Sequence, residues 1–126
     1  MRTLHIPIVN GHIQAGWSSF NPSNNPSASA TKAINVECRS VDDLLEGYEV
    51  DFIKIDVEGA EIEVLEGADQ VMKRNRPVIM IEIRDSNLKK IEELARYTHY
   101  KLIKLENILG IESSRENYFL VPINSS

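Results

Sequence analysis

The chain has 126 residues, of which 42% are hydrophobic and 26% charged, a composition typical of one folded globular domain. Its formal net charge of −5 excludes a general nucleic-acid surface, which needs clustered Lys and Arg side chains. Cys38 is the only cysteine, so an intrachain disulfide and a multi-thiolate metal site are excluded. No signal peptide is evident, and no apolar run approaches the roughly 18 residues that span a bilayer. We therefore expect a cytoplasmic protein.

Residues 1–33 are expected to form a hairpin and a mobile surface loop. Asn10 and Gly11 stand between two apolar runs and predict a type I′ turn, because both residue types accept a positive φ. Pro7 cannot donate a backbone hydrogen bond, so its strand is expected at the edge of a sheet. Residues 18–31 are rich in Ser, Asn and Pro, which predicts the mobile loop.

Residues 34–126 alternate between short apolar runs and amphipathic segments of helical period, which predicts an α/β core. Ser40 followed by Asp43 predicts a helix start, and Gly47 is suited to end that helix. Helical crossovers normally produce parallel strands. The expected strands cover residues 33–39, 50–57, 78–83, 100–105 and 118–123, the helices begin near Ser40, Ala60 and Ser86, and a polar loop covers residues 106–117.

The strand expected at residues 50–57 ends in carboxylates, and it should lie centrally in the sheet. Asp56 and Glu58 stand at its carboxyl end, and Glu82 ends the next strand on the same side, where open α/β sheets bind ligands. Together they could bind a substrate cation, ligate a hard metal or act as general bases. The structural alternative is that Asp56 caps the next helix, Glu58 is solvated and Glu82 pairs with Lys54.

Lys54 stands inside an apolar strand, where an unpaired charge would be costly. Pairing with Glu82 or Asp56 would satisfy it, and this structural role is at least as well supported as a catalytic one. Gly59 permits either a sharp turn between strand and helix or the close approach of a ligand, and both roles stay open.

Three scattered histidines, His5, His12 and His99, have no spacing that indicates a metal site, so we expect surface or packing roles. Trp17 and Phe20 flank the start of the expected mobile loop. They could cover a substrate, but anchoring the loop to the core is the preferred interpretation.

The run of residues 50–68, followed by Arg76-Pro77 and Ile81-Glu82, resembles the signature of the FkbM-type S-adenosylmethionine-dependent methyltransferases. Residues 36–45 also resemble the segment that this family places just before it. The resemblance implies an α/β fold: a partial class I, Rossmann-like methyltransferase sheet, mostly parallel, with a C-terminal antiparallel strand pair and an N-terminal hairpin. It implies S-adenosylmethionine as cofactor and methyl transfer to an oxygen of a small molecule or sugar.

The resemblance also implies site residues. Asp56, Glu58 and Glu82 would be catalytic, and Asp56, Val57 and Gly59 would contact the cofactor. One carboxylate could take the proton from an acceptor hydroxyl, although in-line positioning could supply much of the acceleration without a strong base.

The strand and glycine-rich turn with which family members wrap the cofactor are not found in this sequence. The chain therefore resembles the C-terminal half of such an enzyme, a single partial domain over residues 1–126. A complementing chain, or self-association through an exposed sheet edge, is expected. The alternative is a non-catalytic α/β remnant that acts as a binding or interaction module.

Overall fold

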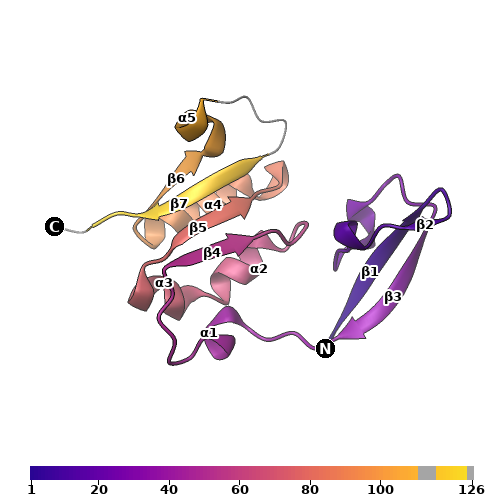
Figure 1. The fold of residues 1–126 in the computed structure, drawn as a ribbon, viewed down its shortest axis with the longest axis horizontal. Coiled ribbons are helices and arrows are strands. Elements are labelled where there is room, and N and C mark those ends of the chain that lie inside the picture. Colours follow the sequence, from indigo (N-terminus) through magenta and orange to yellow (C-terminus); the bar gives the residue numbers. More distant parts are fainter. Residues whose placement is uncertain (111–115, 125–126) are drawn as a thin grey trace. The chain divides into compact units, whose positions relative to one another are not determined.

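The computed structural model describes residues 1–110 and 116–124, which form two compact units (Figure 1). The N-terminal unit consists of Met1–Arg39 together with Val57–Ala60. The C-terminal unit consists of Ser40–Asp56 and the described residues from Glu61 onward. The short segment Val57–Ala60 thus joins a unit that is otherwise built from the start of the chain.

The N-terminal unit contains an antiparallel sheet of three strands in the order β2-β1-β3. The turn between β1 (Arg2–Val9) and β2 (His12–Ile13) has positive φ angles at both central residues, 51° at Asn10 and 77° at Gly11. These angles are those that a type I′ turn requires, so the predicted hairpin is confirmed.

Strand β1 lies in the centre of this sheet, so the prediction that Pro7 marks an edge strand is wrong. The carbonyl oxygen of Pro7 accepts a hydrogen bond from Gln14 N at 2.9 Å. In an antiparallel strand the N–H and C=O of one residue point to the same side. The missing N–H of Pro7 therefore points past the end of β2, and no bond between β1 and β3 is lost.

Strand β3 (Ala30–Val36) begins three residues before the expected start, inside the segment that was expected to be a loop. The rest of that segment contains two single-turn 3₁₀ helices, η1 (Ala15–Trp17) and η2 (Pro22–Asn24). The Asn21 side chain caps η2 by accepting from Ser23 N at 3.0 Å. Such local bonds between side chain and backbone organise a segment that has no apolar periodicity.

The C-terminal unit contains a four-stranded sheet in the order β4-β5-β7-β6. Strands β4 and β5 are parallel, whereas β7 is antiparallel to both of its neighbours. The α/β class and the C-terminal antiparallel pair are confirmed, but the sheet is mixed rather than mostly parallel, because β7 inserts between β5 and β6. The strand bounds are Phe52–Ile55 for β4, Val78–Glu82 for β5, Tyr100–Lys104 for β6 and Asn117–Pro122 for β7.

Strand β4 was expected to be central, but within the described residues it pairs only with β5 and forms an edge of the sheet. The predicted alternation holds, since Ile55 is buried while Phe52 and Lys54 are exposed. In the described part of the chain, no ion pair joins Lys54 to Glu82 or Asp56. Because its ammonium group is exposed to solvent, Lys54 does not need such a partner.

The helix expected from Ala60 to residue 75 is broken into α2 and α3 at Gly67. The carbonyl oxygen of Gly67 accepts from Asp42 N at 2.8 Å, and a Cβ at residue 67 would lie 3.3 Å from the Ser40 Cβ. This close contact with α1 ends the first helix. The helix bounds are Val41–Leu44 for α1, Glu61–Glu66 for α2, Asp69–Asn75 for α3, Asp85–Tyr97 for α4 and Leu105–Leu109 for α5.

Helix α5 occupies the start of the expected polar loop at 106–117, of which residues 111–115 lie outside the described residues. Helix α1 has the predicted cap, because Ser40 Oγ accepts from Asp43 N at 3.1 Å.

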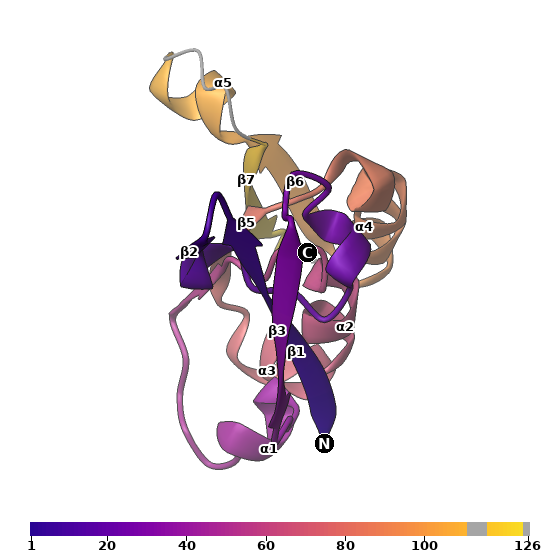
Figure 2. The ribbon, with the colours of Figure 1, turned by 90° about the vertical axis from the view of Figure 1, so that its right-hand side faces the viewer.

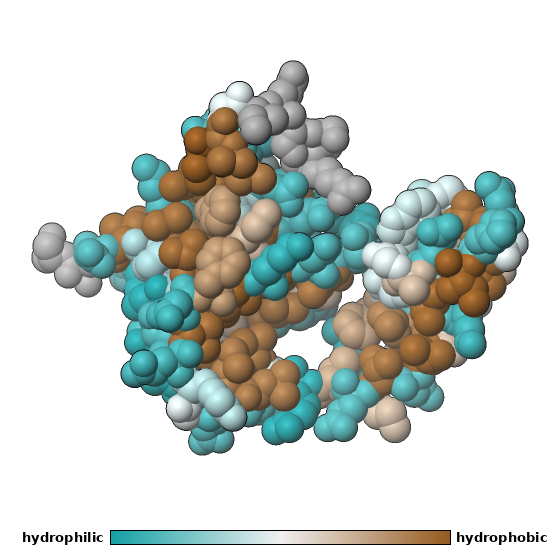
Figure 3. Space-filling model, in the orientation of Figure 1, coloured by the Kyte–Doolittle hydropathy of each residue, from teal (hydrophilic) through white to brown (hydrophobic). Residues whose placement is uncertain are grey.

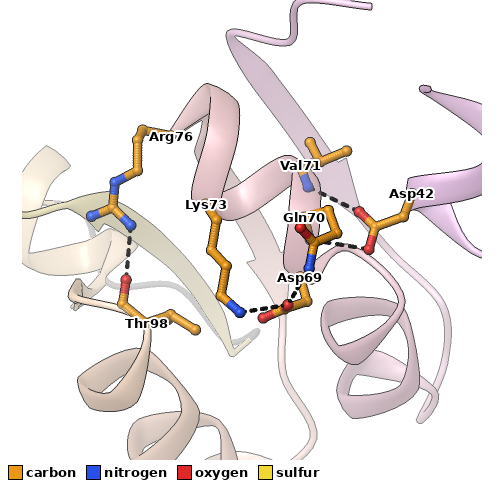
Figure 4. Close-up of polar contacts among 7 residues, drawn as sticks. All are labelled: Asp42, Asp69, Gln70, Val71, Lys73, Arg76 and Thr98. Atoms are coloured by element: carbon orange, nitrogen blue, oxygen red, sulfur yellow. Dashed lines mark hydrogen bonds and ion pairs between the residues drawn. The ribbon is translucent and has the colours of Figure 1, made fainter. Parts of the chain in front are cut away.

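A side chain from α1 caps helix α3 (Figure 4). The carboxylate of Asp42 accepts from the backbone nitrogens of Gln70 at 3.0 Å and Val71 at 2.9 Å. Ala68, at the N-cap position itself, has no side chain that could do this. Asp42 therefore supplies from another helix the bonds that a cap residue normally makes.

At the other end of α3, Arg76 has a left-handed φ of 52° and ends the helix, as Arg76-Pro77 predicted. Its guanidinium donates to the carbonyl oxygen of Thr98 at 2.8 Å (Figure 4). It also donates to the carbonyl oxygen of His99 at 2.7 Å. The same group lies 4.6 Å from the centre of the Tyr100 ring. Arg76 thus joins the end of α3 to the turn between α4 and β6.

The helices α2, α3 and α4 lie on one side of the four-stranded sheet (Figures 1 and 2). Strand β5 is central, as predicted, and its alternate side chains Ile79 and Ile81 are buried, as is Ile83 just after the strand. Its opposite face is half-buried. The core is completed by residues such as Leu65, Val71, Met72, Ile91, Ala95, Tyr100 and Leu120.

Apolar side chains also run across the face of the C-terminal unit that is turned toward the viewer in Figure 3. Large apolar residues of this unit that are exposed include Leu44, Tyr48, Phe52, Ile108 and Leu109. Among the helices of the described residues, none combines the length and the apolar character needed to cross a membrane.

Candidate functional site

The parallel pair β4 and β5 brings two of the candidate carboxylates to neighbouring strand ends. Ile55 lies opposite Ile81 in the register, so Asp56 and Glu82 follow at equivalent positions. Asp56 is exposed and Glu82 is half-buried. Strand β6 runs in the same direction as β5, so the end of β6 and the start of β7 lie at the same edge. We call this the carboxyl edge, defined by Asp56, Glu82, Lys104 and Glu116.

Glu58 and Gly59 belong to the N-terminal unit and adopt a left-handed backbone, with φ angles of 49° and 106°. Glycine is favoured at such a φ, so the turn accounts for Gly59 without a ligand. The carbonyl oxygen of Glu58 accepts from Ser19 Oγ at 3.0 Å and from Asn24 Nδ2 at 3.0 Å. The neighbouring Val57 is half-buried and its carbonyl oxygen faces Ala60 N at 3.4 Å.

The helix-capping alternative for Asp56 is not observed. Helix α2 begins at Glu61, which places Asp56 well before its first turn. Among the described residues, no hydrogen bond joins the Asp56 side chain to that helix. The exposed carboxylate of Asp56 is therefore available to a ligand at the carboxyl edge.

Glu61 is a buried carboxylate whose role the sequence reading missed. Its side chain is only 1% exposed, and its Oε2 accepts from Asn87 Nδ2 at 2.6 Å. This bond joins the first turn of α2 to the first turn of α4. A signal was present in the sequence, because Glu61 precedes the buried Leu65 by four residues and so lies on the same helical stripe.

Charged side chains continue the carboxyl edge along β6 and β7. A hydrogen bond with Asp85 raises the pKa of Glu116 above its usual value, and burial and the Asp85 charge act in the same direction. Lys104 Nζ lies 3.0 Å from Glu106 Oε1, and this bond raises the pKa of Lys104. The edge therefore carries both signs of charge, with carboxylates in the majority.

Within residues 1–110 and 116–124, no group of three or more His, Cys, Asp and Glu side chains is placed to hold a metal ion. His5 lies half-buried in β1, while His12 and His99 are exposed. Phe20 packs under the guanidinium of Arg2 in β1, which lies 4.1 Å from its ring centre, while the anchoring of the loop to the core stays a prediction. Trp17 is 49% exposed.

A surface hollow of about 770 Å³ lies at the other ends of the strands, away from the carboxyl edge. Its lining includes Lys73, Arg76 and His99. The Arg76 guanidinium is engaged with backbone carbonyls, and Lys73 is paired with Asp69 at 2.7 Å. Arg76 and Lys73 therefore already have partners at the ends of helices. The carboxyl edge is the better candidate site.

The comparison with protein families agrees with the motif. The family model described as Methyltransferase FkbM domain matches residues 4–115, which is most of the chain. The match extends through the N-terminal sheet, beyond the region where the motif resemblance lies. No curated protein and no solved structure gives a significant match.

Proposed function

Because the chain belongs to the FkbM methyltransferase family, we propose that it acts in S-adenosylmethionine-dependent methyl transfer to an oxygen of a small molecule or sugar. The observation that carries this proposal is the register of β4 with β5, which ends in Asp56 and Glu82. Ligands of open α/β sheets bind outside the carboxyl ends of parallel strands. We further propose that the C-terminal unit is part of a Rossmann-like sheet.

The donor chemistry at the carboxyl edge fits the methionine end of the cofactor. S-adenosylmethionine supplies, when bound, an activated methyl group on a positively charged sulfur. We assign the exposed Asp56 carboxylate, with the backbone of Val57 and Gly59, to the positively charged end of this molecule. A carboxylate is the natural partner of an ammonium group.

The acceptor hydroxyl loses a proton when its oxygen takes the methyl group. We assign this proton to Glu82 or Glu58, both half-buried carboxyl groups, with Glu82 favoured by its place beside Asp56 in the register. A general base at this position contributes on the order of 10²–10⁴ in rate. Positioning of the acceptor in line with the methyl group supplies a further share.

The adenosine and ribose of the cofactor need protein partners, and the glycine-rich turn that would supply them is not found within residues 1–126. We therefore propose that a complementing polypeptide completes the cofactor site. The open edge of β4 is where it would add a parallel strand, because β4 carries no partner on that side among the described residues.

Calorimetric titration of the 126-residue chain with S-adenosylmethionine tests the proposal. We expect weak binding that Asp56→Asn reduces about tenfold, the effect of losing one charge-assisted contact. Asp51→Asn is the matched control, because Asp51 precedes β4 at the opposite end of the strand. Equal effects of both substitutions would contradict the assignment of Asp56. Micromolar binding by the wild-type chain would contradict the need for a complementing polypeptide.

A second candidate function is a non-catalytic interaction module. It is favoured by the open edge of β4, where Phe52 is 54% exposed and no second strand pairs with β4 within the described residues. In this role a partner polypeptide adds a strand to β4 and makes no use of the cofactor. Absence of any S-adenosylmethionine binding, together with concentration-dependent association in sedimentation experiments that Phe52→Ser abolishes, would favour this function.

A further inference from the structure

We propose that Ser19 and Asn24 are positioning residues that hold the Val57–Ala60 segment in its ligand-binding shape. They would do so through the backbone of Glu58, which both side chains contact. The ligand part of this inference rests on the proposed function, because Gly59 is one of the residues assigned to the cofactor. The conformational part stands on the contacts alone.

The backbone at Glu58 needs support from outside. Its φ of 49° lies in the left-handed region, which few residues with a Cβ adopt. Gly59 follows with a φ of 106°, so two successive residues turn in this sense between β4 and α2. Backbone of this kind persists where the surrounding structure determines it, and such positions are concentrated at functional sites.

The support comes from two side chains that share one acceptor. Ser19 Oγ donates to the Glu58 carbonyl oxygen at 3.0 Å, and Asn24 Nδ2 donates to the same oxygen at 3.0 Å. Asn24 Nδ2 also donates to Ser19 Oγ at 2.9 Å, as does Asn21 N at 3.2 Å. The hydroxyl of Ser19 therefore uses its one donor and both acceptor positions. We call these contacts the Ser19–Asn24 clamp.

Backbone hydrogen bonds to the N-terminal sheet fix the position of Ser19. Ser19 is only 3% exposed, and its backbone forms an isolated antiparallel bridge with His5. His5 N donates to Ser19 O at 2.8 Å, and Ser19 N donates to His5 O at 3.0 Å. Since His5 lies in β1, the central strand, the position of the Ser19 hydroxyl is set by the sheet.

The clamp fixes the Glu58–Gly59 peptide before any ligand arrives. A loop that is already in its bound shape loses less conformational entropy on binding, so affinity rises without a new contact. Ser19 and Asn24 thus act on the ligand through Glu58 and Gly59.

Hydrogen exchange at the Gly59 amide and cleavage of the Glu58–Gly59 bond by a glutamate-specific protease test the clamp directly. We expect Ser19→Ala and Asn24→Asp each to speed both processes by a factor of about five or more, since each removes one of the two hydrogen bonds to the Glu58 carbonyl oxygen and one such bond accounts for about that factor. Ser23→Ala and Asn25→Asp are the matched controls, because these residues bond to Asn21 and to the Trp17 carbonyl instead. Ser19→Thr, which keeps the hydroxyl, should restore slow exchange.

Unchanged exchange and cleavage in both Ser19→Ala and Asn24→Asp would overturn the proposal. So would an equal increase in Ser23→Ala and Asn25→Asp. If Ser19→Ala fails to fold by circular dichroism, Asn24→Asp decides the question, because the side chain keeps its shape while a carboxylate oxygen that cannot donate replaces the amide donor.

Calorimetry with S-adenosylmethionine tests the positioning role. We expect Asn24→Asp to bind S-adenosylmethionine about fivefold more weakly, the same factor as for the opening of the loop. Asn25→Asp should bind it as tightly as the wild type does. Faster exchange without weaker binding would overturn the positioning role. If the wild-type chain binds no S-adenosylmethionine at all, the proposed function fails, and the exchange and cleavage results still decide whether the clamp exists.

Discussion

The two units of the molecule are stabilised in different ways. In the C-terminal unit, Ile79, Ile81, Leu65 and Val71 are almost fully buried between sheet and helices. In the N-terminal unit, β3 is exposed along nearly its whole length, and the buried Ser19 is polar. Hydrogen bonds of turns and side chains therefore contribute more to the stability of the N-terminal unit, and burial of apolar side chains contributes more to that of the C-terminal unit. The stability of the N-terminal unit should be sensitive to backbone and polar substitutions, and that of the C-terminal unit to changes in side-chain volume.

The largest effect is expected from Ile81→Ala in the C-terminal core. Because Ile81 is 0% exposed, we expect this truncation to lower the free energy of unfolding by about 3–4 kcal/mol, measured by urea titration. Ile34→Ala is the control, because Ile34 lies in β3 and is 37% exposed. Equal losses in the two variants would remove the contrast between the units.

Arg76→Lys should have the next largest effect, because a lysine cannot bond to several carbonyl oxygens in the geometry of a guanidinium. We expect a loss of about 2 kcal/mol in the free energy of unfolding. Lys73→Ala is a useful comparison, since Lys73 is an exposed cation of α3 and its removal should change the free energy of unfolding little. A small effect of Arg76→Lys would mean that packing alone holds the turn between α4 and β6.

Asp42→Ala should cost about 1–2 kcal/mol, as for the loss of a helix cap, measured by thermal and urea unfolding. Asp43→Ala is the control, because only the backbone nitrogen of Asp43 takes part in the capping of α1. If both substitutions cost the same, helix-dipole effects rather than the bonds to Gln70 and Val71 would explain the loss.

Gly11→Ala tests the N-terminal unit. At a φ of 77° an alanine is strained, so we expect a loss of about 1 kcal/mol even though a Cβ there would meet no atom. Gly16→Ala, which also meets no atom and lies at an ordinary φ, should be neutral. Hydrogen exchange of the β1 and β2 amides reports this local effect, and equal exchange in both variants would contradict it.

The smallest effect concerns Glu116. Its pKa is raised, mainly by the hydrogen bond with Asp85, so the folded state binds this proton more tightly than the unfolded state does. The resulting stabilisation is fully present below the ordinary pKa of glutamate and is lost as the pH rises through the raised value. Wild type should therefore lose stability relative to Glu116→Gln as the pH rises through this window in urea titrations, because the Gln side chain stays neutral beside Asp85. The exposed Glu66→Gln is the control, and an identical pH dependence in wild type and Glu116→Gln would contradict the assignment.

Much of the local structure could be predicted because its causes lie within a few residues. Asn10-Gly11 specifies its turn, Ser40 caps its own helix, and alternation along β4 identifies the buried Ile55. The strand order could not be predicted, since the insertion of β7 between β5 and β6 depends on pairing partners far apart in the sequence. The break at Gly67 was missed for the same reason, because its cause is contact with α1.

The candidate site divides in the same way. The carboxylates Asp56 and Glu82 were identified from their places at strand ends, and their roles stay predictions. The buried Glu61 was underrated because its partner, Asn87, lies 26 residues later in the chain. The contacts of Ser19 and Asn24 with Glu58 could not be foreseen, because polar loop residues carry no periodic signal of their distant partners.

The composition of the N-terminal unit also has a consequence for the kinetics of folding. The hydrogen bonds from Ser19 and Asn24 to Glu58 close loops of 39 and 34 residues. The chain therefore loses the entropy of closing these loops before the hydrogen bonds can stabilise it. During synthesis the strands β1 to β3 leave the ribosome before β4, yet the unit that contains them is incomplete until Ala60 has followed. We therefore expect this unit to complete its folding at a step that follows formation of the β4–α2 connection.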